Sequence, residues 1–325
     1  MFPAAHAQFD KMDQLSQQQI PFFYIIDFEV ENIEIFREDE LLFSGLMIDF
    51  EYIKTPKPRL DLARNFKFKS NPASLEDYEK GFQHIQKHLK EGYSYLANYT
   101  CSTEIETNLS AEEIFARAEA KYKVFYPGKF VFFSPETFVE TDGNKIKTHP
   151  MKGTIDAAVE NGAELLRKDP KEQAEHYTVV DLLRNDLSMV AERVCVDEFQ
   201  RVDLIRTNKK NLYAMSSEIS GTLKPEFRGK VGSIMRTLLP AGSILGAPKK
   251  KTLEIILEAE NHKRGFYTGV CGYFDGKNLD SCVMIRFIEL QNEKMFFKSG
   301  GGITHLSKLA DEYEEMKNKI YVPIY

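Results

Sequence analysis

Short apolar and aromatic runs, bounded by turn-forming residues, recur along the whole chain. Runs of this length and composition are typical of strands that are buried on at least one face. The strands predicted in this way span residues 22–28, 130–133, 269–274, 282–290 and 295–297. A large content of β-sheet follows from this pattern.

Amphipathic stretches with helical spacing lie between these runs. Two of them open with a capping-box pattern, Ser74 with Asp77 and Ser110 with Glu113, in which side chains satisfy the first backbone N–H groups of a helix. These signals predict helices that end near residues 89 and 122. Further helices are predicted at 227–239, from 248 onward, and at 306–321. Helices and strands are interspersed without strict alternation.

Composition and charge place the chain among ordinary globular proteins. Apolar residues make up 42% of the 325 residues and charged residues 28%, enough for a large core in one big domain or in two packed lobes. The formal net charge is -6, and positively and negatively charged residues are both spread along the chain. The chain therefore offers no positive electrostatic field that would hold nucleic acid. No apolar run approaches the roughly 18 residues that cross a membrane, and the start is unlike a leader. A cytoplasmic protein without a membrane partner is expected.

The cysteines argue against a zinc site and against a disulfide framework. Cys101, Cys195, Cys271 and Cys282 are far apart in the sequence, and no Cys-x-x-Cys pair occurs. All four are therefore expected to be buried free thiols.

A predicted hairpin brings an acid and an amine into one region. The Asp-Gly dipeptide at 142–143 favours a tight turn between two strands. A two-residue turn there sets Glu136 opposite His149, within a few residues of Lys152. A lysine attacks only as the free amine, and a neighbouring carboxylate can move the proton that the attack requires. On spacing alone, an exposed lysine at a strand end is the simpler interpretation.

Two glutamate pairs have the spacing of metal ligands on a helix. Glu172 and Glu175 are three residues apart, and Glu312 and Glu315 repeat that spacing, so each pair faces one side of a helix. Magnesium prefers carboxylate oxygens and commonly takes one or two from the protein. For either pair alone, a solvated helix face in an acidic chain is the simpler interpretation.

Two further features suggest the binding of anions. The three glycines at 300–302 run out of a predicted strand, where bare backbone N–H groups either hold a carboxylate or merely permit a sharp turn. Arg286 lies within the predicted strand 282–290, and its partner there is either a protein carboxylate or a substrate carboxylate. No phosphate-loop motif accompanies them, so nucleotide binding has no support.

Taken in order, these segments resemble the chorismate-utilising enzymes, a family that includes anthranilate synthase component I, aminodeoxychorismate synthase component I, isochorismate synthase and salicylate synthase. The segments that carry the resemblance are 134–136, 150–154, 172–186, 240–249, 264–269, 285–286, 300–302 and 312–319. The resemblance implies an α+β fold with large antiparallel sheets flanked by helices. It also implies one catalytic domain over residues 1–325, with a reduced N-terminal region over 1–70.

The resemblance assigns roles to the residues singled out above. It implies a Mg²⁺ ion held by Glu175 and Glu315, with Glu172 and Glu312 in support, and acid–base work for Glu136. Residues 153–154 are implied to form the floor of the substrate pocket, namely Gly153 and Thr154. The residues implied to hold the carboxylates and enolpyruvyl group of chorismate are Ser243, Tyr267, Arg286, Gly300, Gly301, Gly302 and Lys319.

Lys152 distinguishes the branches of this family. Anthranilate synthases resemble Pro-[Ile/Leu]-Ala-Gly-Thr where this chain has Pro-Met-Lys-Gly-Thr, and the lysine form is similar to the aminodeoxychorismate synthase branch. The implied reaction has the Lys152 amine attack ring carbon 2 as the 4-hydroxyl leaves; ammonia then enters at carbon 4 and expels the lysine. The product is 4-amino-4-deoxychorismate, on the route to 4-aminobenzoate and folate. Because the chain carries no glutaminase signature, a separate glutaminase subunit is expected to supply the ammonia.

Two positions depart from the family pattern and keep alternatives open. Ala214 stands where many relatives have a histidine that is credited with helping a hydroxyl leave, and Leu245 stands where serine or threonine is frequent. Ala214 and the short N-terminal region motivate a non-catalytic chorismate-binding homologue as one alternative. The other is an enzyme like anthranilate synthase component I that releases pyruvate, against which Lys152 argues.

Overall fold

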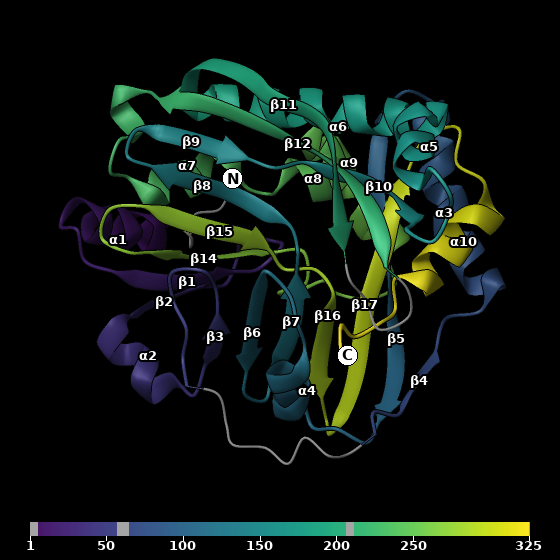
Figure 1. Ribbon diagram of the computed structural model, residues 1–325, viewed down its shortest axis with the longest axis horizontal. Helices are drawn as coiled ribbons and strands as arrows, with labels where there is room; N and C mark the ends of the chain where they lie inside the picture. The colour runs from purple at the N-terminus through teal and green to yellow at the C-terminus, as the bar shows by residue number, and fades with distance from the viewer. Residues whose placement is uncertain (1–5, 57–64, 206–210, 325) are drawn as a thin grey trace.

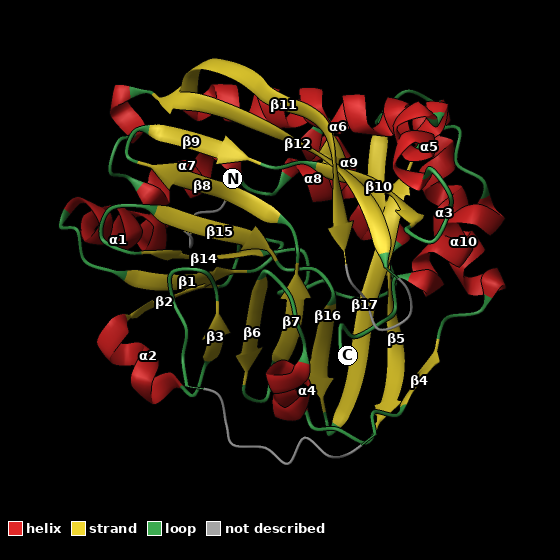
Figure 2. Cartoon of the chain, viewed as in Figure 1, coloured by secondary structure: helices red, strands yellow, loops and turns green. Residues whose placement is uncertain are grey.

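The computed structural model describes residues 6–56, 65–205 and 211–324. Two large sheets form its centre, and all pairings between the named strands are antiparallel. In the view of Figure 1, the strands of one sheet run across the picture and those of the other run up and down. Helices gather around the outside (Figure 2). The predicted α+β fold with large antiparallel sheets flanked by helices is confirmed.

The first sheet contains nine strands within the described residues. They follow the order β10-β12-β9-β8-β15-β14-β1-β2, and β11 pairs with β12 at one edge. Their bounds are β1 Phe22–Ile26, β2 Ile33–Arg37, β8 Thr137–Asp142, β9 Lys145–Thr148, β10 Met151–Asp156, β11 Ala191–Ile205, β12 Leu212–Leu223, β14 Val270–Phe274 and β15 Leu279–Val283.

The second sheet contains eight strands in the described part of the chain. They follow the order β13-β5-β17-β16-β7-β6-β3, and β4 pairs with β5. Their bounds are β3 Met47–Asp49, β4 Phe68–Asn71, β5 Leu96–Thr107, β6 Tyr122–Tyr126, β7 Phe130–Ser134, β13 Gly246–Ala247, β16 Phe287–Gln291 and β17 Lys294–Ile303.

The helices begin where the capping signals predict. Ser74 accepts a hydrogen bond from the Asp77 N–H, and Ser110 forms a reciprocal capping box with Glu113. The helix after Ser110 ends five residues before its predicted end, because the backbone at Ala118 becomes extended. The helix bounds are α1 His6–Gln17, α2 Glu38–Ser44, α3 Leu75–Lys90, α4 Ala111–Arg117, α5 Gly162–Lys168, α6 Pro170–Val190, α7 Val231–Leu238, α8 Gly242–Leu245, α9 Lys249–Ala259 and α10 Leu309–Asn318, with a 3₁₀ turn at Pro225–Phe227.

Burial of both faces of β1 explains why its sequence is apolar throughout. Phe22 and Tyr24 belong to a larger core that includes residues of α1, α3, α6, α7, α9 and α10, whereas Phe23 and Ile25 belong to a smaller core. The smaller core lies between the sheets, since it also takes residues from β14 of one sheet and from β6 and β7 of the other. A strand buried on both faces needs apolar residues at every position.

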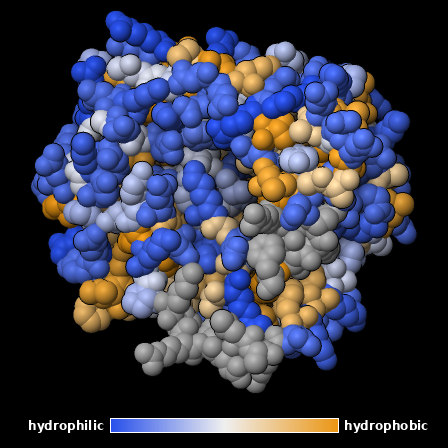
Figure 3. All heavy atoms as spheres, in the orientation of Figure 1, coloured by the Kyte–Doolittle hydropathy of each residue, from blue (hydrophilic) through white to orange (hydrophobic). Residues whose placement is uncertain are grey.

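The surface is mainly hydrophilic on the face seen in Figure 3, with several apolar patches, one of which lies over α2. Leu42 and Phe43 of this helix are 79% and 90% exposed. Among the described residues, no helix has the length and apolar character needed to span a membrane. All four cysteines are free, as predicted, but Cys195 is exposed rather than buried, because β11 is an edge strand.

Two predictions about the second half of the chain are wrong. The predicted strand 282–290 is two strands, one in each sheet, and Arg286 lies in the link between them with a φ of +51°. The three glycines at 300–302 lie inside β17 rather than after it. They pair with residues 98–100 of β5, and a Cβ atom on Gly300 would lie 2.2 Å from the carbonyl oxygen of Tyr99. Their small size therefore serves close packing within a sheet.

The register of the predicted hairpin is also wrong. Asp142 pairs with Lys145, so the turn residues are Gly143 and Asn144, and Gly143 has a φ of +58°. Glycine at the first central position suits a type II′ turn, which matches the twist of the flanking strands. The strand β8 begins only at residue 137, so Glu136 does not lie opposite His149.

Candidate active site

Two short links carry the chain between the sheets, side by side. Residues 135–136 connect β7 to β8, and residues 284–286 connect β15 to β16. The Val283 N–H donates to the carbonyl oxygen of Glu136 at 3.1 Å, and the Phe133 N–H donates to that of Arg286 at 3.1 Å. Glu136 and Arg286 are thus held at the junction of the sheets by backbone hydrogen bonds.

Glu136 is the predicted site residue whose surroundings are best defined. The hydroxyl of Ser243 donates to its Oε1 at 2.7 Å. Burial raises the pKa of the Glu136 carboxyl above its ordinary value, and the Ser243 hydrogen bond and the charges of Lys152, Arg286 and Lys319 oppose that shift only in part. This carboxyl therefore keeps its proton to a higher pH than an exposed glutamate does, as a proton donor requires.

Lys152 lies in β10 just before a bulge. Lys152 pairs with Met215 and Thr154 pairs with Ala214, so Gly153 is the extra residue, and its φ is +80°. Bulges re-aim side chains and are frequent beside active sites. Lys152 is partly buried, contrary to the exposed lysine that spacing alone favours, whereas Thr154 is exposed.

The glutamate pairs lie on helices, as predicted, and Glu172 of the first pair and both glutamates of the second lie close to a glycine. A Cβ atom on Gly153 would lie 2.6 Å from Oε2 of Glu172 on α6. A Cβ atom on Gly301 would lie 3.3 Å from Oε1 of Glu315 and 3.5 Å from Oε2 of Glu312, both on α10. Because glycine has no Cβ atom, the two glycines leave room for these carboxylates.

Lys152 connects the two glutamate pairs in space. Its Nζ lies 3.6 Å from the position that a Cβ atom would take on Gly302, the residue after Gly301. The carboxylates of α6 and α10 therefore border the same part of the molecule. Carboxylate oxygens from two helices are a donor set that suits Mg²⁺, so the residues present fit this metal. Glu312 is buried, and Oε1 of Glu315 forms an ion pair with Lys319 at 2.6 Å, a contact that a bound ion would replace.

Cationic and aromatic side chains surround the same junction. The Nε of Arg286 donates to the Tyr321 hydroxyl at 3.1 Å, and its guanidinium stacks on that ring at 5.0 Å. Lys319 donates to the carbonyl oxygen of Gly300 at 2.9 Å. Tyr267 is 4% exposed, and burial raises the pKa of its hydroxyl.

His176 is a buried residue of this region to which the sequence assigned no role. Its Nε2 is 2.7 Å from Oγ of Ser217. Burial, and then the charge of Lys152, lower the pKa of His176 to about 4, so its imidazole is neutral at physiological pH. Its position directly after Glu175 in a predicted helix is the signal that could have identified it.

Comparison with known proteins places the chain in a family. The model of chorismate binding enzymes matches residues 35–324. An uncharacterized PabA-like protein of Pasteurella multocida is 46% identical over 98% of this chain and 99% of its own length. Anthranilate synthase component 1 of Saccharomyces cerevisiae is 31% identical over 79% of this chain and 52% of its own length.

Solved structures agree in fold. The menaquinone-specific isochorismate synthase of Escherichia coli superposes with a TM-score of 0.74 over 96% of this chain and 80% of that chain, at 17% identity. The two sheets and the junction between them are therefore a fold shared with enzymes that use chorismate. The chain belongs to the family of chorismate binding enzymes.

Proposed function

We propose that the chain aminates chorismate at ring carbon 4, as the synthase subunit of an aminodeoxychorismate synthase on the route to 4-aminobenzoate and folate. The observation that supports this most strongly is the partly buried Lys152, which lies just before the bulge of β10 with its Nζ 3.6 Å from the position of a Cβ atom on Gly302. The resemblance implies alanine at this position in the anthranilate synthase branch of the family. The lysine supplies a nucleophile, and Glu136 supplies a carboxyl of raised pKa.

The first half of the reaction forms a covalent adduct. The Lys152 amine forms a bond to ring carbon 2, and both ring double bonds shift, from carbons 1 and 2 to carbons 1 and 6 and from carbons 5 and 6 to carbons 4 and 5. The second shift breaks the bond from carbon 4 to its hydroxyl oxygen. Protonated Glu136 gives its proton to the departing oxygen, which leaves as water. The resulting Glu136 carboxylate then takes a proton from the alkylated lysine nitrogen, so the adduct is neutral at nitrogen.

The second half releases the lysine. Ammonia forms a bond to ring carbon 4, both double bonds shift back to their original positions, and the bond from carbon 2 to Lys152 breaks as Glu136 returns a proton to the lysine nitrogen. The new ammonium group loses a proton to Glu136. The net change replaces the 4-hydroxyl by an amino group and forms one water molecule, and the enolpyruvyl group stays on the ring.

The substrate is bound by the groups around the junction of the two sheets. Arg286 and Lys319 offer charge-assisted hydrogen bonds to carboxylates, with Ser243, Tyr267 and the backbone at 300–302 beside them. Glu175 and Glu315, supported by Glu172 and Glu312, would hold Mg²⁺, which supplies positive charge to the ring carboxylate. Thr154 and Gly153 border this region at the bulge of β10.

Changing Arg286 to lysine is expected to raise KM for chorismate by about 10- to 100-fold, with a smaller effect on kcat. Lysine keeps the charge but loses the planar pair of donors that holds a carboxylate. Steady-state kinetics at saturating ammonium measure the effect. The same change at Arg184, an exposed residue of α6, should leave KM unchanged, and equal effects at both positions would contradict the role of Arg286.

Changing Gly153 to alanine is expected to reduce the apparent affinity for Mg²⁺ in turnover by at least about 10-fold, since the new Cβ displaces the Glu172 carboxylate. Gly143 provides a matched control. It also has a positive φ, but a Cβ there has nothing within 4 Å. The alanine variant of Gly143 therefore introduces backbone strain of about 1–2 kcal/mol without any new steric contact. Equal Mg²⁺ dependence in the two variants would remove Glu172 from the metal site.

Ammonia is proposed to come from a separate glutaminase subunit. Copurification of the chain with glutaminase activity would support this partner. Turnover with glutamine by the pure chain would contradict it.

The function itself is tested by identifying the product. The pure chain, incubated with chorismate, Mg²⁺ and ammonium, is expected to form 4-amino-4-deoxychorismate, identified by its mass, without release of pyruvate. Pyruvate released together with anthranilate would establish the activity of an anthranilate synthase instead. Chorismate that binds but is not consumed would establish a non-catalytic homologue, an alternative that the buried Ala214 opposite Thr154 keeps open.

A further inference from the structure

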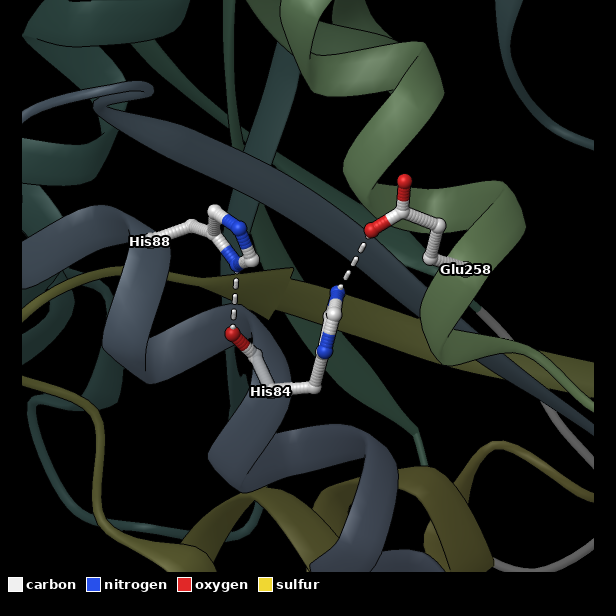
Figure 4. Close-up of side chains that lie close together, drawn as sticks. All are labelled: His84, His88 and Glu258. Carbon is white, nitrogen blue, oxygen red and sulfur yellow. Dashed lines mark hydrogen bonds and ion pairs between the residues drawn. The ribbon is translucent and has the colours of Figure 1, made fainter.

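A second group of metal-ligating side chains lies outside the chorismate site. His84 and His88 project from α3 toward Glu258 of α9 (Figure 4). One ligand atom from each of the three residues lies within 4.8 Å of the others. None of the three takes part in the reaction proposed above. We infer that His84, His88 and Glu258 form a binding site for a divalent transition-metal ion of the zinc class.

The spacing of the two histidines suits a shared ligand. Residues four apart on a helix lie on the same face, and two histidines with this spacing are a recurrent way of binding zinc. The ring centroids of His84 and His88 are 4.6 Å apart. The Nε2 of His84 is 3.3 Å from Oε2 of Glu258. Ligands at about 2.0–2.1 Å from a tetrahedral zinc ion lie about 3.3–3.4 Å from one another, so this pair already has the required separation.

A hydrogen bond fixes the tautomer of His88. Its Nδ1 is 3.0 Å from the carbonyl oxygen of His84, as Figure 4 shows. A carbonyl oxygen only accepts, so Nδ1 carries the proton and Nε2 carries the lone pair. Histidine ligands of metals are commonly oriented in this way, with the second ring nitrogen donating to a backbone carbonyl.

The two helices are held together beside the cluster by other contacts. The hydroxyls of Ser94, which follows α3, and Thr252 of α9 are 2.7 Å apart and buried. Lys251 of α9 lies 5.7 Å from the ring centroid of Tyr93. The cluster is therefore arranged before a metal binds. Glu258 is exposed, so its side chain can rotate to complete the coordination.

The ligand types separate this site from the four glutamates of α6 and α10. Imidazole nitrogens favour zinc and its neighbours in the transition series, whereas oxygen-only sites favour Mg²⁺. Three protein ligands leave a fourth position for water. An ion bound there joins α3 to α9, and it should raise the stability of the folded state because it binds that state alone.

Zinc binding tests this inference without reference to any reaction of chorismate. The purified chain in excess Mg²⁺ is titrated with Zn²⁺ against a chelating indicator, and Tm is measured with and without the ion. The unaltered chain is expected to bind one Zn²⁺ ion at this site and to show a higher Tm. The double change of His84→Gln with His88→Gln should weaken binding at least about 10-fold and abolish the rise in Tm.

Two controls keep this result interpretable. His305→Gln alters an exposed histidine elsewhere, and Glu254→Gln alters a glutamate one turn earlier on α9; both variants should bind Zn²⁺ like the unaltered chain. Glu258→Gln changes an exposed side chain, so it tests the site even if the double variant does not fold. Equal Zn²⁺ affinity in the Glu258→Gln variant and the unaltered chain would overturn the inference. Failure of the unaltered chain to bind Zn²⁺ in excess Mg²⁺ would reduce the cluster to the His84–Glu258 ion pair and would also overturn it.

Discussion

Replacing Lys152 by alanine is expected to lower kcat/KM for the formation of 4-amino-4-deoxychorismate by at least about 1,000-fold. Without the amine, ammonia has to displace the 4-hydroxyl directly, and the covalent route is lost. Binding of chorismate should change little, because other groups hold its carboxylates. Product formation at limiting ammonium, together with equilibrium binding of chorismate, separates the two effects.

The alanine variant of Lys250 is a suitable control, since this lysine is exposed on α9. It should aminate chorismate at the rate of the unaltered chain. If the Lys152→Ala variant retained that rate at limiting ammonium, the covalent route would be wrong, even if the product were correct.

Changing Glu136 to glutamine is expected to reduce amination by about 100- to 10,000-fold and at the same time to raise Tm at neutral pH. The activity falls because glutamine cannot transfer the proton. The stability rises because burial raises the pKa of Glu136 in the folded chain, so ionisation above the ordinary value of about 4.5 disfavours folding. The gain in Tm should vanish below that pH, where the carboxyl is protonated in both states.

Glu140, four residues further on in β8, provides a control of opposite sign. A hydrogen bond with His149 lowers the pKa of Glu140, so its ionised form stabilises the fold above the ordinary pKa, and this contribution is lost as the pH falls. The glutamine variant of Glu140 should therefore lower Tm at neutral pH and leave amination intact. A fall in Tm for both variants would contradict the assigned environment of Glu136. Thermal unfolding across the pH range distinguishes these outcomes.

Local signals predicted the helix starts and the buried strands well. The Ser74 and Ser110 caps are contacts within one turn, and the apolar run of β1 reflects burial on both faces. Long strands such as β11 and β12 were not predicted, because polar residues occupy much of β11 at the sheet edge. Alternation along an edge strand is weak, so pairing with the neighbouring strand decides the structure there.

The site was predicted as a set of residues but not as an arrangement. The spacing within each glutamate pair predicts a helix face, yet their approach to Gly153 and Gly301 depends on how α6 and α10 pack. The proximity of Glu136 to Lys152 was predicted from a hairpin whose register is wrong, although the charge of Lys152 does oppose the rise that burial causes in the pKa of Glu136. It comes instead from a link between the two sheets, which no local pattern reveals.

The arrangement of the zinc-type cluster of His84, His88 and Glu258 could not be predicted from the sequence either. The expectation that the chain has no zinc site rested on the cysteines, but the ligands of this cluster are histidines and a glutamate. The spacing of His84 and His88 is visible in the sequence, whereas Glu258 lies on a different helix. Only the contact between α3 and α9 brings the third ligand to the pair. When a site takes residues from several helices or strands, the sequence therefore predicts some of those residues. How they come together depends on the packing of the helices and strands.

The covalent role of Lys152 is tested most directly by the mass of the intact protein. The chain is mixed with chorismate and Mg²⁺ in the absence of any ammonia source, and its mass is followed over time. A covalent role of Lys152 predicts a gain in mass equal to chorismate less one water, located on the peptide that contains Lys152 and reversed when ammonium is added. Amination that proceeds without such an adduct, or an adduct on another residue, would contradict it.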